Sequence, residues 1–245
     1  MTNDSSFLRL QARTQRFTLG TPRGFQVSPD GRRVLFLRSA SGEDRQHILW
    51  RLDVETGEET RLADPTVLLG GTEELSAEER ARRERSREQG GGVVGNATDG
   101  AVRVAAFALS GKVFVADAET GDVRELDTAG PVVDPRPEPT GTHVAYVSGN
   151  ALRVVGIGTG GAGAGDRALA EPDGPDRAVG VAEFIAAEEM GRARGFWSNA
   201  WKTIRNDPST LPTSAPPGPQ KRRPSGRRSP TVLTQRNGRS TWWLT

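Results

Sequence analysis

Two adjacent carboxylates, Glu188 and Glu189, are the residues of this chain whose types and spacing point most directly to a binding chemistry. Neighbouring negative charges repel each other, and a cation between them relieves the repulsion. A free α-amino group suits that place because it stays protonated up to a pKa of about 8. An acidic pair also occurs in solvated helix turns, so the residue types alone leave both interpretations open.

The residues around the pair favour binding. Residues 182–197 read AEFIAAEEMGRARGFW, so an Arg-containing step and a Gly-Phe-Trp run follow the two glutamates. This segment resembles the bacterial dipeptidyl peptidase IV-like serine peptidases of the prolyl oligopeptidase family. In that family a double-Glu motif on the β-propeller domain grips the substrate's N-terminal ammonium. The resemblance covers about residues 7–198 and implies that Glu188 and Glu189 bind a peptide N-terminus.

A second group of candidates lies in residues 73–89, EELSAEERARRERSREQ. Ser76 followed by Glu79 forms a capping-box pattern, and three glycines come after the segment, which predicts a helix over about 73–89. Few apolar residues lie on it, so we expect a solvated arm, whose arginines could simply form salt bridges on the helix. The resemblance implies instead that one arm arginine holds a substrate carbonyl. The candidates are Arg82, Arg83 and Arg85.

The groups that a serine peptidase needs for bond cleavage are not recognisable. The sequence has no G-x-S-x-G nucleophile elbow. His47 and His143 fall in predicted strands, with no serine and carboxylate spaced to converge on them. With 2 His and 0 Cys, neither a transition-metal site nor another cofactor is expected. Residues 158–163 (GTGGAG) match G-x-G-x-x-G but precede no helix, which favours a hairpin loop over a dinucleotide site.

The elements that must position these groups are β-strands. Residues 24–64 alternate short apolar runs with Pro, Asp and Gly turns, as a four-stranded unit does. LWRLDVETGEETRL (49–62) aligns with VFVADAETGDVREL (113–126), and SPDGRRVLFL (28–37) aligns with EPTGTHVAYV (138–147). Four strands in each repeat of roughly 40 residues indicate propeller blades. The predicted fold is all-β, a partial β-propeller of about three four-stranded blades with one inserted polar helix.

The chain divides into two parts by composition. We expect an incomplete propeller domain over residues 1–198 and a Pro/Ser/Arg-rich tail over 199–245 that is disordered or out of frame. The tail has a net charge of +8 and the first 198 residues one of −6, so the pI of about 9.5 reflects the tail. The interpretation of the protein as a nucleic-acid binder depends on this basic tail alone, so nucleic acid is not an expected partner.

The sequence therefore predicts a truncated, non-catalytic piece of a serine dipeptidyl peptidase whose parent releases N-terminal dipeptides. Its expected partners are a peptide N-terminus, in the intact parent, and further copies of itself through open blade edges. The alternative is a stand-alone propeller-type protein-interaction module. No signal peptide and no apolar run of transmembrane length is recognisable, so we expect a cytoplasmic protein without a membrane partner.

Overall fold

The computed structural model describes residues 7–71, 73–158, 165–174 and 178–181, and most of their regular structure is β-strand. The strands form three sheets in which consecutive strands pair antiparallel. The first sheet has the order β1 (Arg23–Val27), β2 (Arg33–Ser39), β3 (Gln46–Asp53) and β4 (Glu59–Ala63). The two-residue strand β5 (Gly91–Gly92) pairs in parallel with the start of β3.

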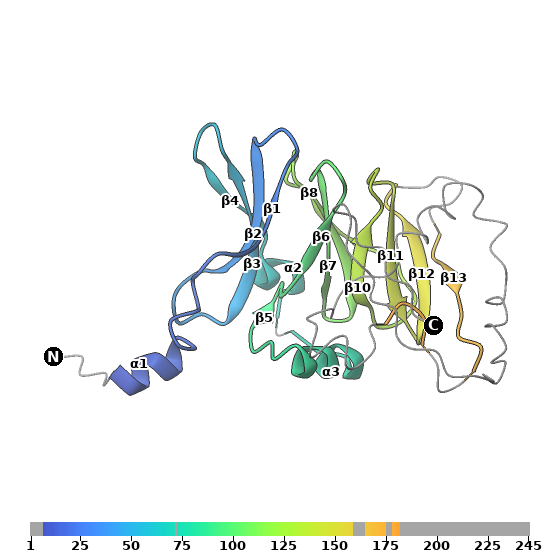
Figure 1. Ribbon diagram of the computed structural model, residues 1–245, viewed down its shortest axis with the longest axis horizontal. Coiled ribbons are helices and arrows are strands. Elements are labelled where there is room, and N and C mark those ends of the chain that lie inside the picture. Colours follow the sequence, from blue (N-terminus) through green and yellow to red (C-terminus); the bar gives the residue numbers. More distant parts are fainter. Residues whose placement is uncertain (1–6, 72, 159–164, 175–177, 182–245) are drawn as a thin grey trace, which may run out of the picture. The chain divides into compact units, whose positions relative to one another are not determined.

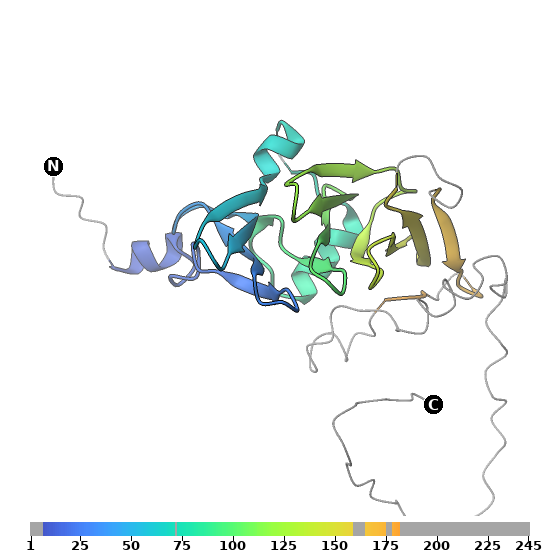
Figure 2. The same ribbon diagram turned by 90° about the horizontal axis from the view of Figure 1, so that it is seen from above.

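The second and third sheets repeat the four-strand order. The second contains β6 (Asn96–Thr98), β7 (Val104–Leu109), β8 (Lys112–Asp117) and β9 (Val123–Leu126). The third contains β10 (Val133–Pro137), β11 (His143–Ser148), β12 (Ala151–Gly156) and β13 (Arg167–Ala170). The sheets follow one another in chain order (Figures 1 and 2). The described residues therefore form a partial β-propeller with three four-stranded blades, as the sequence predicted.

The aligned hairpins of the first two blades have the same turn. In each turn an aspartate Oδ1, of Asp53 or Asp117, accepts hydrogen bonds of 2.7–3.0 Å from the backbone N–H groups two and three residues further on. The fourth residue after each aspartate is a glycine with positive φ, 74° at Gly57 and 84° at Gly121. Glycine adopts this conformation without steric cost, so the Asp-x-x-Thr-Gly pattern specifies the turn.

The blades pack through the apolar residues that alternate along their central strands. Leu35 and Leu49 of the first sheet share a buried cluster with Phe107 and Phe114 of the second. A second cluster joins the other face of the second sheet to the third sheet and contains the fully buried Tyr146. The middle blade is therefore buried on both of its faces.

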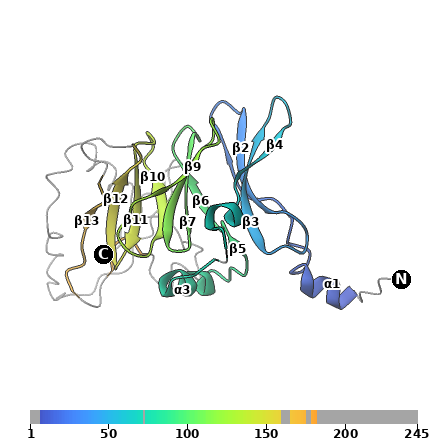
Figure 3. The ribbon, with the colours of Figure 1, turned by 180° about the vertical axis from the view of Figure 1, so that it is seen from behind.

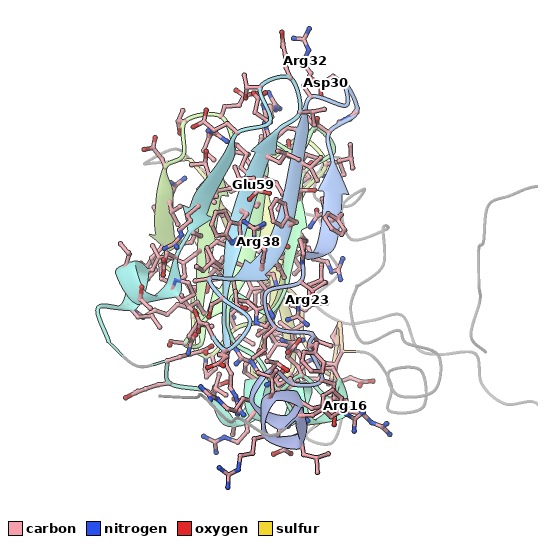
Figure 4. The ribbon with its side chains drawn as sticks, turned by 90° about the vertical axis from the view of Figure 1, so that its left-hand side faces the viewer. Arg16, Arg23, Asp30, Arg32, Arg38 and Glu59 are labelled. Carbon is pink, nitrogen blue, oxygen red and sulfur yellow. The ribbon has the colours of Figure 1, made fainter. Side chains whose placement is uncertain are left out.

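The other face of the first sheet carries aromatic rings that arginines partly cover. Phe36 and Trp50 are cross-strand neighbours whose ring centroids lie 6.4 Å apart. The guanidinium of Arg38 lies 4.4 Å from the centroid of the Trp50 ring and forms an ion pair with Glu59 (Figure 4). A cation over an aromatic face is attracted by the ring's quadrupole. Phe36 is 3% exposed, whereas Phe25 on β1, whose ring centroid lies 6.0 Å from that of Phe36, is 60% exposed.

Three helices accompany the sheets in the described residues: α1 (Phe7–Arg13), α2 (Pro65–Leu69) and α3 (Ala77–Arg85). The sequence predicted only α3, over the longer range of about 73–89. Ser76 caps α3 as predicted, because its Oγ accepts a hydrogen bond of 3.1 Å from the backbone N–H of Glu79. The expectation of a fully solvated arm is wrong, since Glu79 and Arg83 are 4% and 6% exposed.

Several sequence predictions fall outside the described residues. These are the double Glu at 188–189, most of the loop at 158–163 and the tail at 199–245. Within the ranges that the structure describes, no helix combines the length and the apolar character needed to span a membrane.

Candidate functional site

Helix α3 lies at one end of the second sheet (Figures 1 and 3). A small recess lies beside this helix. Its volume is about 20 Å³, which gives room for one water-sized group. The residues that line it come from α3, from β6 and the two residues before it, and from β7 and β10. They are Glu79, Arg82, Val94, Gly95, Asn96, Ala108, Asp134 and Pro135. The recess thus joins the arm helix to the first strands of two neighbouring blades.

Arg82 is the cation of this recess, and Glu79 fixes its orientation. The Nε and Nη2 atoms of Arg82 each donate a hydrogen bond of 2.7 Å to the carboxylate of Glu79. Burial alone would lower the pKa of Arg82, but the carboxylate of Glu79 and the charge of Asp134 outweigh burial and raise it. Within the described ranges no hydrogen bond engages Nη1. Arg82 can therefore donate a hydrogen bond from Nη1 to an oxygen of a ligand.

Glu79 is kept ionised by the same contacts. Burial by itself would raise its pKa, but hydrogen bonds and charges from Arg82 and Arg83 lower the pKa below the ordinary value for glutamate. A carboxylate with a lowered pKa holds its partners at neutral pH. Arg82 is thus presented to the recess by a preorganised ion pair.

Arg83 belongs to the framework of the arm. Its side chain is 7% exposed and donates from Nη2 to Glu73 at 2.5 Å and from Nε to Glu79 at 2.9 Å. Its Nη1 donates to the carbonyl oxygen of Gly90 at 3.2 Å. Glu73 also accepts a hydrogen bond of 2.7 Å from the backbone N–H of Gly92. Arg83 therefore fastens α3 to β5 and is not available to a ligand.

The three arm arginines named from the sequence are thus in different situations. Arg82 lines the recess, and Arg83 is buried in the framework. Arg85 is the last residue of α3, and its side chain lies outside what the structure describes. Arg82 is the candidate for the predicted substrate-holding role.

A polar cluster that the sequence analysis missed lies next to the arm. Arg23 at the start of β1 forms an ion pair of 2.8 Å with Glu88, which follows α3. Burial would raise the pKa of Glu88, but Arg23 outweighs burial and lowers it. The imidazole of His47 packs against the backbone of Gly90. A Cβ added at Gly90 would lie only 2.5 Å from Cε1 of His47. Burial, followed by the charge of Arg23, lowers the pKa of His47 and favours the neutral ring.

The second histidine takes part in a hydroxyl–imidazole–carboxylate group that does not have the geometry of a catalytic triad. Thr142 Oγ1 donates to Glu138 at 2.6 Å and lies 2.9 Å from His143 Nδ1. In a triad the imidazole bridges hydroxyl and acid, but here the hydroxyl bridges them. Both histidines lie in strands, as predicted. Among the residues that the structure describes, no three His, Asp or Glu side chains gather as a metal site.

Comparisons with known proteins give weak similarities. No protein-family model matches the chain. The dipeptidyl peptidase 4 of Porphyromonas gingivalis matches 70% of this chain at 17% identity, with a TM-score of 0.41. A prolyl endopeptidase matches 67% at 14% identity with a TM-score of 0.42, and TolB from Acinetobacter baumannii matches 62% at 13% identity with 0.38. This chain spans 23%, 24% and 33% of the lengths of those structures, in that order.

Proposed function

We propose that this chain binds the free N-terminus of a peptide and does not cleave it, as the propeller part of a dipeptidyl peptidase-like serine peptidase would. The observation that carries the proposal is the position of Arg82. Its guanidinium is fixed by Glu79 and lines a recess with room for one water-sized group. An arginine that offers one nitrogen in such a space is suited to a carbonyl or carboxylate oxygen.

In this proposal the arm and the double Glu divide the recognition of the peptide. Arg82 holds a carbonyl oxygen, and Glu188 with Glu189 holds the α-ammonium group. The sequence of residues 182–197 supports the second role, because two carboxylates at neighbouring positions compensate one cation. Holding both groups positions the peptide, and positioning alone supplies effective molarity without supplying a nucleophile.

The arm arginines provide the test. Replacing Arg82 with methionine removes the donor and leaves Glu79 paired with Arg83. We expect Arg82→Met to weaken the binding of Ala-Pro amide by about tenfold to hundredfold, since a hydrogen bond to a charged group contributes about 1.5–3 kcal/mol. Isothermal titration calorimetry measures the affinity.

Arg80→Met is the matched control, because Arg80 is an exposed arginine of the same helix with the same charge. It should leave the affinity within about twofold of the wild type, as expected for a surface substitution. Equal affinities for the wild type and Arg82→Met would contradict the role of Arg82. Hydrolysis of an X-Pro chromogenic substrate that is lost on denaturation of this protein would contradict the non-catalytic assignment.

A further inference from the structure

A large polar groove lies between the N-terminal segment and the residues that follow α3. Its volume is about 1070 Å³, and its walls include residues from 11–21 and from 86–89. The N-terminal wall is attached to the first sheet, because the backbone N–H of Gly20 donates to Ser39 Oγ at 2.9 Å. Thr14 and Leu19 of the same wall are 6% and 5% exposed. The groove is therefore formed by segments that are far apart in the sequence, and its N-terminal wall is held against the first sheet.

The charge of this groove is strongly positive. Four arginines and one glutamate line it, and Arg23 is paired with the glutamate, Glu88, at 2.8 Å. The other three arginines are Arg16, Arg45 and Arg87. They are exposed, and within the described ranges no carboxylate lies within ion-pair distance of them. Three unpaired guanidinium groups around one space produce a local potential that attracts an anion.

The uncharged lining matches the polar groups of a peptide. The amides of Gln11, Gln15 and Gln89 can both donate and accept hydrogen bonds. Two buried donors of lining residues, Gln15 Nε2 and Arg23 Nε, have no acceptor among the described residues, and an unsatisfied buried donor costs free energy. Phe17, 48% exposed, adds one aromatic face to the groove. Carboxylates and peptide carbonyls supply the acceptors that such a lining lacks.

We propose that this groove binds an acidic peptide segment. A single-stranded nucleic acid is the competing polyanion, but proteins bind it on several aromatic platforms, and this lining has one ring, Phe17. The net charge of −6 on the first 198 residues also repels a long polyanion, while a short acidic segment contacts only the basic groove. This site needs no free peptide N-terminus, so it goes beyond the function proposed above.

The test uses the full chain and an N-acetylated, fluorescein-labelled hexaglutamate peptide. Acetylation removes the α-ammonium group, so failure of this site and failure of the N-terminus site are distinguishable. The variant is Arg45→Gln/Arg87→Gln, which removes two of the three unpaired charges of the groove. The control is Arg32→Gln/Arg124→Gln, which removes two exposed charges elsewhere. Arg32 lies at the end of the first sheet opposite to Arg16 (Figure 4).

We expect the groove variant to lower the affinity for hexaglutamate by about fivefold to tenfold, as the loss of two exposed ion pairs predicts. The control should change it by less than about twofold, and added salt should weaken binding by the wild type. Full affinity in the groove variant would place binding on the basic tail and overturn the proposal. An equal loss in the control, no binding by the wild type, or tighter binding of hexathymidylate than of hexaglutamate would also overturn it.

Discussion

Replacing Arg83 with methionine is expected to destabilise the protein by about 3–5 kcal/mol, because it breaks a buried ion pair and leaves a carboxylate without its cation. Methionine keeps most of the volume of the arginine stem, so the effect isolates the guanidinium. Glu79 would still be paired with Arg82, whereas Glu73 would retain only the backbone N–H of Gly92. Arg83→Lys should not restore stability, since an ammonium cannot reproduce the forked contacts to Glu73, Glu79 and Gly90.

Urea denaturation measures this effect as a shift of the midpoint at constant slope. Arg80→Met on the exposed side of α3 is the control and should stay within about 0.5 kcal/mol of the wild type. If Arg83→Met were as stable as Arg80→Met, the buried network would not be what fastens α3 to β5.

Truncating Phe107 to alanine should cost about 3–5 kcal/mol, because it removes a buried ring and leaves a cavity. Phe107 is 0% exposed, and its ring centroid lies 5.7 Å from that of Phe114. It belongs to the cluster that joins the first two blades, so the loss reports on the contact between blades. Phe7→Ala is the matched control, since Phe7 is 65% exposed. Equal denaturation midpoints for the two variants would contradict the packing of the first blade on the second.

The blades were predictable because their signals are local. Short apolar runs form β2, β3, β7 and β8, and turn residues separate the strands. In the middle blade, only residues 113–126 align with another blade in the sequence. The first turn of the middle blade, at Asp99, has the hydrogen bonds of the turns at Ser28 and Glu138. Val102, with φ 55°, stands where the other two blades have glycine. The turn has Gly100 where the other two have proline, so the Pro-x-Gly spacing that aligns the other two turns is absent from it.

Helix α2 shows a signal that was present and overlooked. Asp64 caps the helix by accepting a hydrogen bond of 3.0 Å from the backbone N–H of Thr66, and Pro65 occupies the first turn. Gly70 ends the helix with φ 61°. Asp-Pro followed five residues later by Gly is a recognisable start and stop. Because α2 has only five residues, the strand pattern on its N-terminal side led to the prediction of strands and turns alone in this region.

The candidate site was predictable only in part. The capping box located α3, but Arg82 and Arg83 are adjacent arginines with no local difference between them. Their environments differ because the fold brings Glu73 and the carbonyl oxygens of Gly90 and Gly92 to Arg83, which donates to all three. The basic groove was not predictable at all, since Arg16, Arg45 and Arg87 come from three separate segments. Only the fold brings those charges around one space.

The most direct test of the central claim compares one peptide with and without its N-terminal charge. Ala-Pro amide and N-acetyl-Ala-Pro amide are titrated into the wild type and into Glu188→Gln/Glu189→Gln. We expect acetylation to weaken binding to the wild type by about tenfold to hundredfold, because it removes a charge-assisted contact. The double Gln variant should bind both peptides with similar, weak affinity. Equal affinity of the wild type for the free and the acetylated peptide would contradict the claim that this chain binds a peptide N-terminus.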